Sequence, residues 1–222
     1  MTAPLFKRPA ALDTERMRLG VFGGTFDPVH YGHLLLAELC REACRLDQVW
    51  FVPAASPPHK QRQGLTPAAR RVEMLELATG GHEAFAVSRL EVERGGVSFT
   101  VDTLAQLKAE APDRELFFLL GADSLRDLPQ WREPRRICEL ALPVIVGRSG
   151  APPPDLGALA PLVSPERLDE IRRNQVQMPE IGLSSRDFRR RVAAGLSIRY
   201  QTPRAVEKYI EAAGLYRGER PE

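Results

Sequence analysis

The stretch VFGGTFDPVHYGH, residues 21–33, joins an apolar segment to a helical one through a glycine loop. The apolar run before the glycines, residues 19–22, is typical of a buried strand, and the leucine-rich residues after His33 are typical of a helix. Glycine lets a ligand approach the backbone, and a helix N-terminus presents unpaired N–H groups. The stretch therefore predicts a phosphate-binding loop that includes Gly23, Gly24 and Thr25.

Two histidines, His30 and His33, stand where the loop enters the predicted helix. Nucleotidyl transfer depends on positioning and on donors that stabilise charge, so imidazole N–H groups here predict that a phosphate is transferred as well as bound. The same histidines could bind a metal, lie in the core or cap the helix. The metal interpretation is disfavoured because no glutamate lies between them, as it does in helical zinc motifs.

Apolar strands alternate with helical segments along the rest of the chain. Strands are expected at 19–22, 48–52, 84–87, 115–120, 141–146 and 176–178, and helices at 33–45, 67–78, 103–110, 165–174, 185–194 and 203–213. This alternation predicts an α/β fold: a Rossmann-like parallel sheet with helices on both faces and a small helical C-terminal part. Ligands of such sheets bind at the carboxyl ends of the strands, which is where the glycine loop lies. Pro143 predicts that its strand lies at an edge of the sheet.

The length of 222 residues suits one domain, expected over residues 17–216, with flexible tails at 1–16 and 217–222. Residues 149–161 are rich in proline and glycine, and they predict an exposed, mobile connection within that domain.

The composition of the chain indicates which kinds of partner and which cellular compartment to expect. A net charge of +2 gives no general signature of nucleic-acid binding, and no apolar run is long enough to cross a membrane. Three cysteines without disulfide spacing suit a reducing cytoplasm and are expected to be buried, unreactive thiols.

A second anion-binding stretch is predicted near the C-terminus. Ser184 or Ser185 can cap the helix that follows, and Arg189 lies in the first two turns of that helix. A capped helix with nearby arginines suits a triphosphate, although a basic helix that merely faces solvent would look the same.

Four more residues follow predicted strands or precede predicted helices. Asp123 suits ribose hydroxyls, a metal or a helix cap, and Trp131 suits stacking on a heterocycle or covering the core edge. Lys60 places a cation on a proline-stiffened loop, and Thr100 either recognises a ligand or caps a helix.

The stretch GGTFDPVHYGH resembles the signature of the nucleotidyltransferase superfamily with the HxGH motif. Further stretches resemble one of its families, the bacterial nicotinate-nucleotide adenylyltransferases: they are PPHK at 57–60, FTVDTL at 99–104, GAD at 121–123 with Trp131, SS at 184–185 through Arg189, and SIRY at 197–200. The resemblance runs from about Leu19 to Leu215. The chain departs from the usual Ser-Ser-Thr pattern at its third position, where it has Arg186.

The resemblance implies that ATP and nicotinate mononucleotide react to give deamido-NAD and pyrophosphate, with Mg²⁺ carried on the ATP phosphates. It implies direct in-line attack without a covalent intermediate. His30 and His33 would stabilise the α-phosphate, and Asp123 would contact a ribose. Trp131 would stack on the pyridine ring, and Thr100 would help recognise its carboxylate. The groups expected to hold the phosphates are Gly23, Gly24, Thr25, Lys60, Ser184, Ser185 and Arg189.

The sequence leaves two kinds of alternative function open. A sister adenylyltransferase would act on nicotinamide mononucleotide or pantetheine phosphate instead. A non-catalytic module would only bind nucleotide, or would bind nucleic acid through residues 186–191; the intact histidine pair and the low net charge argue against both. A homo-oligomer remains possible.

Overall fold

A computed structural model describes residues 16–58, 64–150, 152 and 154–217. Six strands form one sheet in the order β3-β2-β1-β4-β5-β6, and every pair is parallel. The strands are β1 Arg18–Gly24, β2 Gln48–Pro53, β3 Phe85–Val87, β4 Glu115–Gly121, β5 Leu142–Arg148 and β6 Val176–Met178. The predicted Rossmann-like parallel sheet is thus confirmed.

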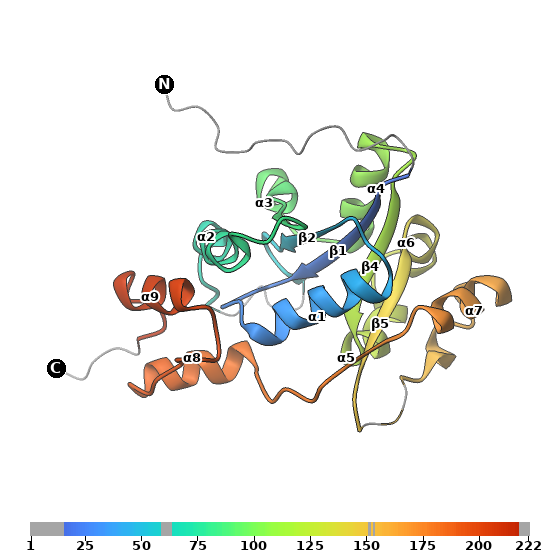
Figure 1. The fold of residues 1–222 in the computed structure, drawn as a ribbon. Coiled ribbons are helices and arrows are strands. Elements are labelled where there is room, and N and C mark those ends of the chain that lie inside the picture. The colour runs from blue at the N-terminus through green and yellow to red at the C-terminus, as the bar shows by residue number, and fades with distance from the viewer. Residues whose placement is uncertain (1–15, 59–63, 151, 153, 218–222) are drawn as a thin grey trace.

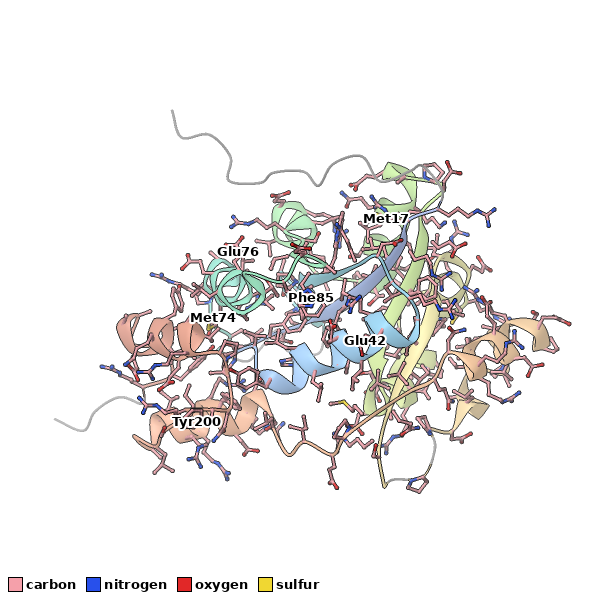
Figure 2. All side chains as sticks on the ribbon, viewed as in Figure 1. Met17, Glu42, Met74, Glu76, Phe85 and Tyr200 are labelled. Carbon is pink, nitrogen blue, oxygen red and sulfur yellow. The ribbon has the colours of Figure 1, made fainter. Side chains whose placement is uncertain are left out.

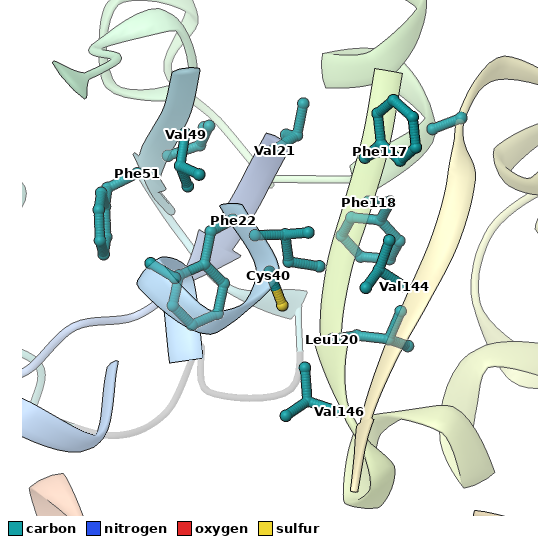
Figure 3. Close-up of a cluster of buried hydrophobic side chains, with 14 of the residues drawn as sticks. Val21, Phe22, Cys40, Val49, Phe51, Phe117, Phe118, Leu120, Val144 and Val146 are labelled. Carbon is teal, nitrogen blue, oxygen red and sulfur yellow. The ribbon is translucent and has the colours of Figure 1, made fainter. Parts of the chain in front are cut away.

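The core lies on both faces of the central strands, as their continuous apolar runs require. Figure 3 shows Phe22 of β1 and Phe118 of β4 among side chains from neighbouring strands, and both are buried. Cys40 of the first helix packs in the same cluster. All three cysteines, Cys40, Cys44 and Cys138, are free and buried, as expected.

Helices connect the strands. They are α1 Tyr31–Ala43, α2 Ala68–Thr79, α3 Leu90–Arg94, α4 Thr100–Glu110, α5 Ala122–Asp127, α6 Pro134–Leu140, α7 Pro165–Arg173, α8 Ser185–Ala193 and α9 Arg204–Ala212, with short 3₁₀ turns η2 Leu128–Gln130 and η3 Leu156–Ala158. Figure 1 shows α1 in front of the sheet, with α8 and α9 near the carboxyl end of β1. The C-terminal helices therefore reach the predicted phosphate loop.

The C-terminal part is packed against α2. Met74 of α2 is fully buried, and Figure 2 places it between α2 and α9. The hydroxyl of Tyr216 lies 4.0 Å from the Met74 sulfur. This packing fixes the last described residues to the body of the protein.

One expectation from proline content is wrong. β5 is not an edge strand, because it pairs with β4 on one side and β6 on the other. However, β6 pairs only with Val146–Arg148, so the missing N–H of Pro143 lies on a stretch that β6 leaves uncovered. The described residues of the connection over 149–161 are mostly exposed, as expected, although Leu156 and Leu159 are buried in the core. Its mobility stays a prediction.

Several helices escaped the sequence analysis because they are short. α3, α5 and α6 have five, six and seven residues, too few for an apolar period to appear. α4 begins at Thr100, three residues before the expected start. No helix of the described residues is long and apolar enough to cross a membrane. The predicted domain boundaries and terminal tails stay predictions, because residues 1–15 and 218–222 lie outside the described part.

Candidate functional site

The phosphate loop, defined here as Gly23–His30, starts with the last two residues of β1 and ends at the start of α1. Phe26 in this loop has a positive φ of 48°, and its ring folds back over Gly24. A Cβ added to Gly24 would lie 2.8 Å from that ring, so a larger residue would displace the aromatic side chain. Gly24 is thus needed for close packing inside the loop as well as for any approach of a ligand.

A buried arginine on α2 holds the phosphate loop from beneath. Arg71 is only 1% exposed. Its guanidinium donates hydrogen bonds to four carbonyls, those of Thr25, Ala54, Ala55 and Thr66. Because buried polar groups need partners, this one side chain satisfies carbonyls of three segments at once and joins the phosphate loop to the loop after β2.

The middle of the phosphate loop is anchored by Asp27, which is also 1% exposed. Its carboxylate accepts hydrogen bonds from the Tyr216 hydroxyl at 2.6 Å and from the Thr66 N–H at 3.2 Å. Its backbone carbonyl accepts one from the Arg189 guanidinium at 2.7 Å. The C-terminal part therefore grips the loop through both a side chain and the main chain.

The start of α8 also contacts the phosphate loop. Ser184 is the N-cap of α8, as predicted, and its hydroxyl accepts a hydrogen bond from the Asp187 N–H. Ser185 donates its hydroxyl proton to the Pro28 carbonyl at 2.9 Å. Arg186 is exposed on the surface of the helix. Ser185 and Arg189 thus contact the loop directly, and Ser184 caps the helix that carries them. Their binding of a triphosphate stays a prediction.

His30 and His33 lie face to face at the N-terminus of α1. Their ring centroids are 3.7 Å apart and the rings are nearly parallel, at 19°. His30 is the N-cap residue, so the helix begins at Tyr31, two residues before His33, rather than at His33. A Cβ on Gly32 would come within 3.1 Å of the His30 ring, so the glycine between the histidines makes room for their stacking.

The surroundings of the two rings determine the charge of His30 and the tautomer of His33. Burial lowers the pKa of His30 to about 4, so this imidazole is neutral at pH 7. The Nδ1 atom of His33 accepts the backbone N–H of His30 at 3.2 Å, so a neutral His33 ring carries its proton on Nε2. Among the described residues, the buried Nδ1 of His30 has no hydrogen-bond partner. His30 can therefore donate or accept a hydrogen bond without carrying charge.

A first cavity of about 230 Å³ opens at the carboxyl end of β1. It brings together five residues that the sequence analysis singled out: Gly23, Gly24, Thr25, Thr100 and Trp131. Trp131 packs its ring edge-on against Phe118 of β4, with centroids 5.9 Å apart. The cavity has the apolar, aromatic lining typical of a site for a flat ring.

A second cavity of about 440 Å³ lies at the carboxyl ends of β4 and β5, and Asp123 and Leu36 are part of its lining. Asp123 lies in the first turn of α5 and is not its N-cap, which is Gly121. Its carboxylate pairs with Arg126 at 3.0 Å and Arg148 at 3.3 Å. The β1–α1 unit reaches both cavities, because Gly23–Thr25 line the first and Leu36, three residues after His33, lines the second.

The structure adds residues that sequence reasoning missed. Arg71 supports the loop, Arg148 pairs with Asp123, and Arg132 and Glu91 line the first cavity. Only Arg71 left a signal in the sequence: it lies on the same helix face as Leu75 and Ala78, so it is a charged residue on an apolar stripe. Lys60 lies outside the described residues.

Among the described residues, no group of three histidine, cysteine, aspartate or glutamate side chains is arranged to hold a metal ion. The acidic groups nearest the two cavities are engaged otherwise. Asp123 is paired with arginines, and Glu91 accepts the Thr103 hydroxyl at 2.5 Å.

Comparisons with known proteins agree with this geometry. Residues 21–191 match the family model described as cytidylyltransferase-like. A protein of Thermomicrobium roseum named "Probable nicotinate-nucleotide adenylyltransferase" is 49% identical over 200 residues, covering 90% of this chain and 92% of its own. A protein of the same name from Thermus thermophilus is 48% identical over 201 residues, covering 90% of this chain and all of its own length.

A solved structure supports the fold. It is the Plasmodium falciparum nicotinic acid mononucleotide adenylyltransferase complexed with NaAD, which superposes with a TM-score of 0.67 over 90% of this chain and 98% of that one. At 18% sequence identity, this likeness extends to the fold alone.

Proposed function

Since this chain belongs to the cytidylyltransferase-like family and, within it, to the nicotinate-nucleotide adenylyltransferases, we propose that its two cavities and histidine pair carry out adenylyl transfer to nicotinate mononucleotide. The resemblance predicted from its motifs is confirmed. The reaction converts ATP and nicotinate mononucleotide to deamido-NAD and pyrophosphate, a step of NAD biosynthesis.

The observation that carries this assignment is the position of the histidine pair. His33 follows the loop that lines the first cavity, and Leu36, one turn further along α1, lines the second. Two substrates in these cavities would therefore meet at the N-terminus of α1, where the helix dipole favours phosphate.

The bond changes need little covalent chemistry from the protein. A phosphate oxygen of nicotinate mononucleotide attacks the α-phosphorus of ATP, and the bond from that phosphorus to the oxygen bridging to the β-phosphate breaks. Pyrophosphate leaves with the electron pair of that bond. The attacking phosphate is already ionised, so no general base is required and no covalent intermediate forms. His33 Nε2–H and the neutral His30 donate to the α-phosphate as charge develops on it.

The remaining residues hold the substrates. In the first cavity, Trp131 stacks on the pyridine ring and Thr100 contacts its carboxylate. In the second cavity, Asp123 binds a ribose of the adenosine. Gly23, Gly24, Thr25, Ser184, Ser185 and Arg189 bind the phosphates, and Lys60, which lies outside the described residues, is expected to add positive charge near them. The buried Nδ1 of His30, unpartnered among the described residues, supports a polar ligand at this point.

Magnesium fits this chain as part of the ATP complex. The described residues provide no cluster of carboxylates and imidazoles for it, so the ATP phosphates and water would be its ligands. Bound there, it would neutralise triphosphate charge, while the protein residues named above would contact the phosphates.

The same proposal extends to the compartment, the domain organisation and the partners of the enzyme. We propose a cytoplasmic enzyme of one domain over residues 17–216 that uses no nucleic acid or membrane partner. Self-association into a homo-oligomer is compatible with the proposal.

The test is the release of pyrophosphate from ATP with nicotinate mononucleotide, nicotinamide mononucleotide or pantetheine phosphate as the acceptor. The expected result is the highest kcat/KM with nicotinate mononucleotide. Faster turnover of either other acceptor would assign the chain to a sister reaction. ATP binding without turnover of any acceptor would mean that the chain only binds nucleotide.

A further inference from the structure

The first cavity contains two ionisable side chains to which the proposed function gives no role. Among its described lining residues, Arg132 is the one cation and Glu91 the one anion. The other lining residues are apolar or neutral. The inference drawn from this pair rests on the proposed function, because it concerns how the first cavity selects its ligand.

Arg132 is held at the rim of the first cavity by an aromatic ring and two carboxylates. Its guanidinium lies 4.9 Å from the centroid of the Phe99 ring, and Phe99 also lines the cavity. Its Nη1 atom is 3.2 Å from Asp102, and its Nε atom is 3.6 Å from Glu133. Stacking and two ion pairs orient a planar group that carries five N–H donors, and the side chain is still half exposed.

Glu91 makes the interior of the same cavity unfavourable for a second negative charge. Its side chain is buried, with the residue 6% exposed. Its carboxylate accepts the Thr103 hydroxyl, and burial raises its pKa. A ligand carboxylate placed near Glu91 without a cation would add to an already costly buried charge.

The two pyridine mononucleotides differ in charge and hardly in shape. Nicotinate carries a carboxylate where nicotinamide carries a carboxamide of similar size, so packing against Trp131 cannot separate them. Discrimination needs a group that responds to charge. We propose that Arg132 is the specificity-determining residue that selects the pyridine carboxylate over the carboxamide. Asp102 acts as a positioning residue that keeps the guanidinium on Phe99.

The experiment compares Arg132→Gln, Arg132→Lys and the control Arg136→Gln. Arg136 is a half-exposed arginine on α6, paired with Glu139 and absent from the lining of the first cavity. For each protein, kcat and KM are measured with nicotinate and with nicotinamide mononucleotide at saturating ATP. Dissociation constants for both acceptors are measured without ATP.

Arg132→Gln should lower kcat/KM for the acid about 10- to 100-fold, the range of one charge-assisted hydrogen bond. Most of this change should appear in KM and in the dissociation constant, because the contact is far from the reacting phosphorus. Turnover of the amide should change less than about threefold. Arg132→Lys should keep part of the preference, because it retains the charge without the planar fork. Arg136→Gln should match the parent protein.

An equal fall of kcat/KM for both acceptors would overturn the inference, since it would mean that Arg132 only packs on Phe99. The absence of any change in kcat/KM for either acceptor would overturn it as well. These outcomes are separate from failure of the proposed function. If the parent protein does not turn over nicotinate mononucleotide, the proposed function itself is wrong. If it does, and Arg132→Gln keeps the parent's ratio of kcat/KM for the acid to that for the amide, only the role given to Arg132 is wrong.

Discussion

The phosphate loop and the first cavity are adjacent, but they are held by different kinds of contact. The loop is fixed by groups that water does not reach: Arg71 and Asp27 are each 1% exposed, and His30 is 6% exposed. The rim of the cavity is fixed by an ion pair whose members, Arg132 and Asp102, have side chains 50% and 38% exposed.

This difference in burial separates the residues proposed for catalysis from the residue proposed to select the acceptor. Removing one partner from a buried polar network leaves unsatisfied groups and is costly, whereas exposed ion pairs contribute little to stability. The geometry of the phosphate loop, which we propose to be catalytic, is therefore built into the folded state. Substitution at the cavity rim, which we propose to select the acceptor, should change its charge without unfolding the protein.

The largest expected effect is on the catalytic side of this comparison. Under the proposed mechanism, His33→Ala removes a donor for the α-phosphate, so turnover should fall about 10²- to 10³-fold. The half-buried ring allows the variant to fold, so its melting temperature should stay near that of the parent. The measurement is pyrophosphate release together with a thermal melt.

The matched control is His82→Ala. His82 is partly exposed, pairs with Glu38 at 3.1 Å and stacks on Phe85 outside both cavities. Its removal should leave turnover unchanged. Survival of turnover in His33→Ala would make the histidine pair structural and remove the basis for treating the loop as catalytic.

The same comparison explains how far the sequence could be interpreted. Local signals revealed the strand–glycine–helix unit, the Ser184 cap and the alternating fold, because each depends on neighbours in the chain. The supports of the site depend on residues far apart: Asp27 meets Tyr216, and Arg71 meets Thr25. No spacing rule connects such positions. Arg132 escaped because exposed arginines are common and only the fold places this one at a cavity.

The second prediction removes the buried support of the loop. Arg71→Met leaves four carbonyls without their donor, and the free energy of unfolding should fall by about 3 kcal/mol. Arg71→Lys should lose less, because it keeps the charge but cannot reach all four acceptors. Urea denaturation measures both. If Arg71→Met were as stable as the parent, the loop would not depend on its buried contacts.

The third prediction uses pH. The folded-state pKa of His30 is about 4, against 6.5 for an ordinary histidine, because burial opposes the charged form. Between these values the unfolded chain binds a proton that the folded chain does not. The stability due to this group is complete above pH 6.5 and falls by about 3 kcal/mol as the pH drops toward 4.

His30→Asn should remove that part of the pH dependence, so unfolding free energies measured from pH 7 to pH 4 should fall less steeply than in the parent. Identical slopes in the parent and His30→Asn would show that His30 is hydrated enough to titrate normally. The loop would then be less sealed from water than its burial implies.

The smallest effect should come from the C-terminal contact with the phosphate loop. Tyr216→Phe deletes only the hydroxyl that donates to Asp27, and hydrogen bonds to charged groups contribute about 1.5–3 kcal/mol to stability. We expect a loss near the lower end, because the Thr66 N–H still donates to the same carboxylate. The control Tyr200→Phe, at a side chain 87% exposed, should change nothing.

The loss of stability in Tyr216→Phe, compared with its loss of kcat, shows what the contact between Tyr216 and Asp27 does. Arg189 still holds the Asp27 carbonyl in Tyr216→Phe, so kcat should fall only a few-fold while unfolding becomes easier. Loss of stability with an unchanged kcat would mean that the C-terminal part supports the fold and not the loop. A fall in kcat that matches His33→Ala would mean that this one hydroxyl positions the histidines, and the buried frame would then depend on its last tyrosine.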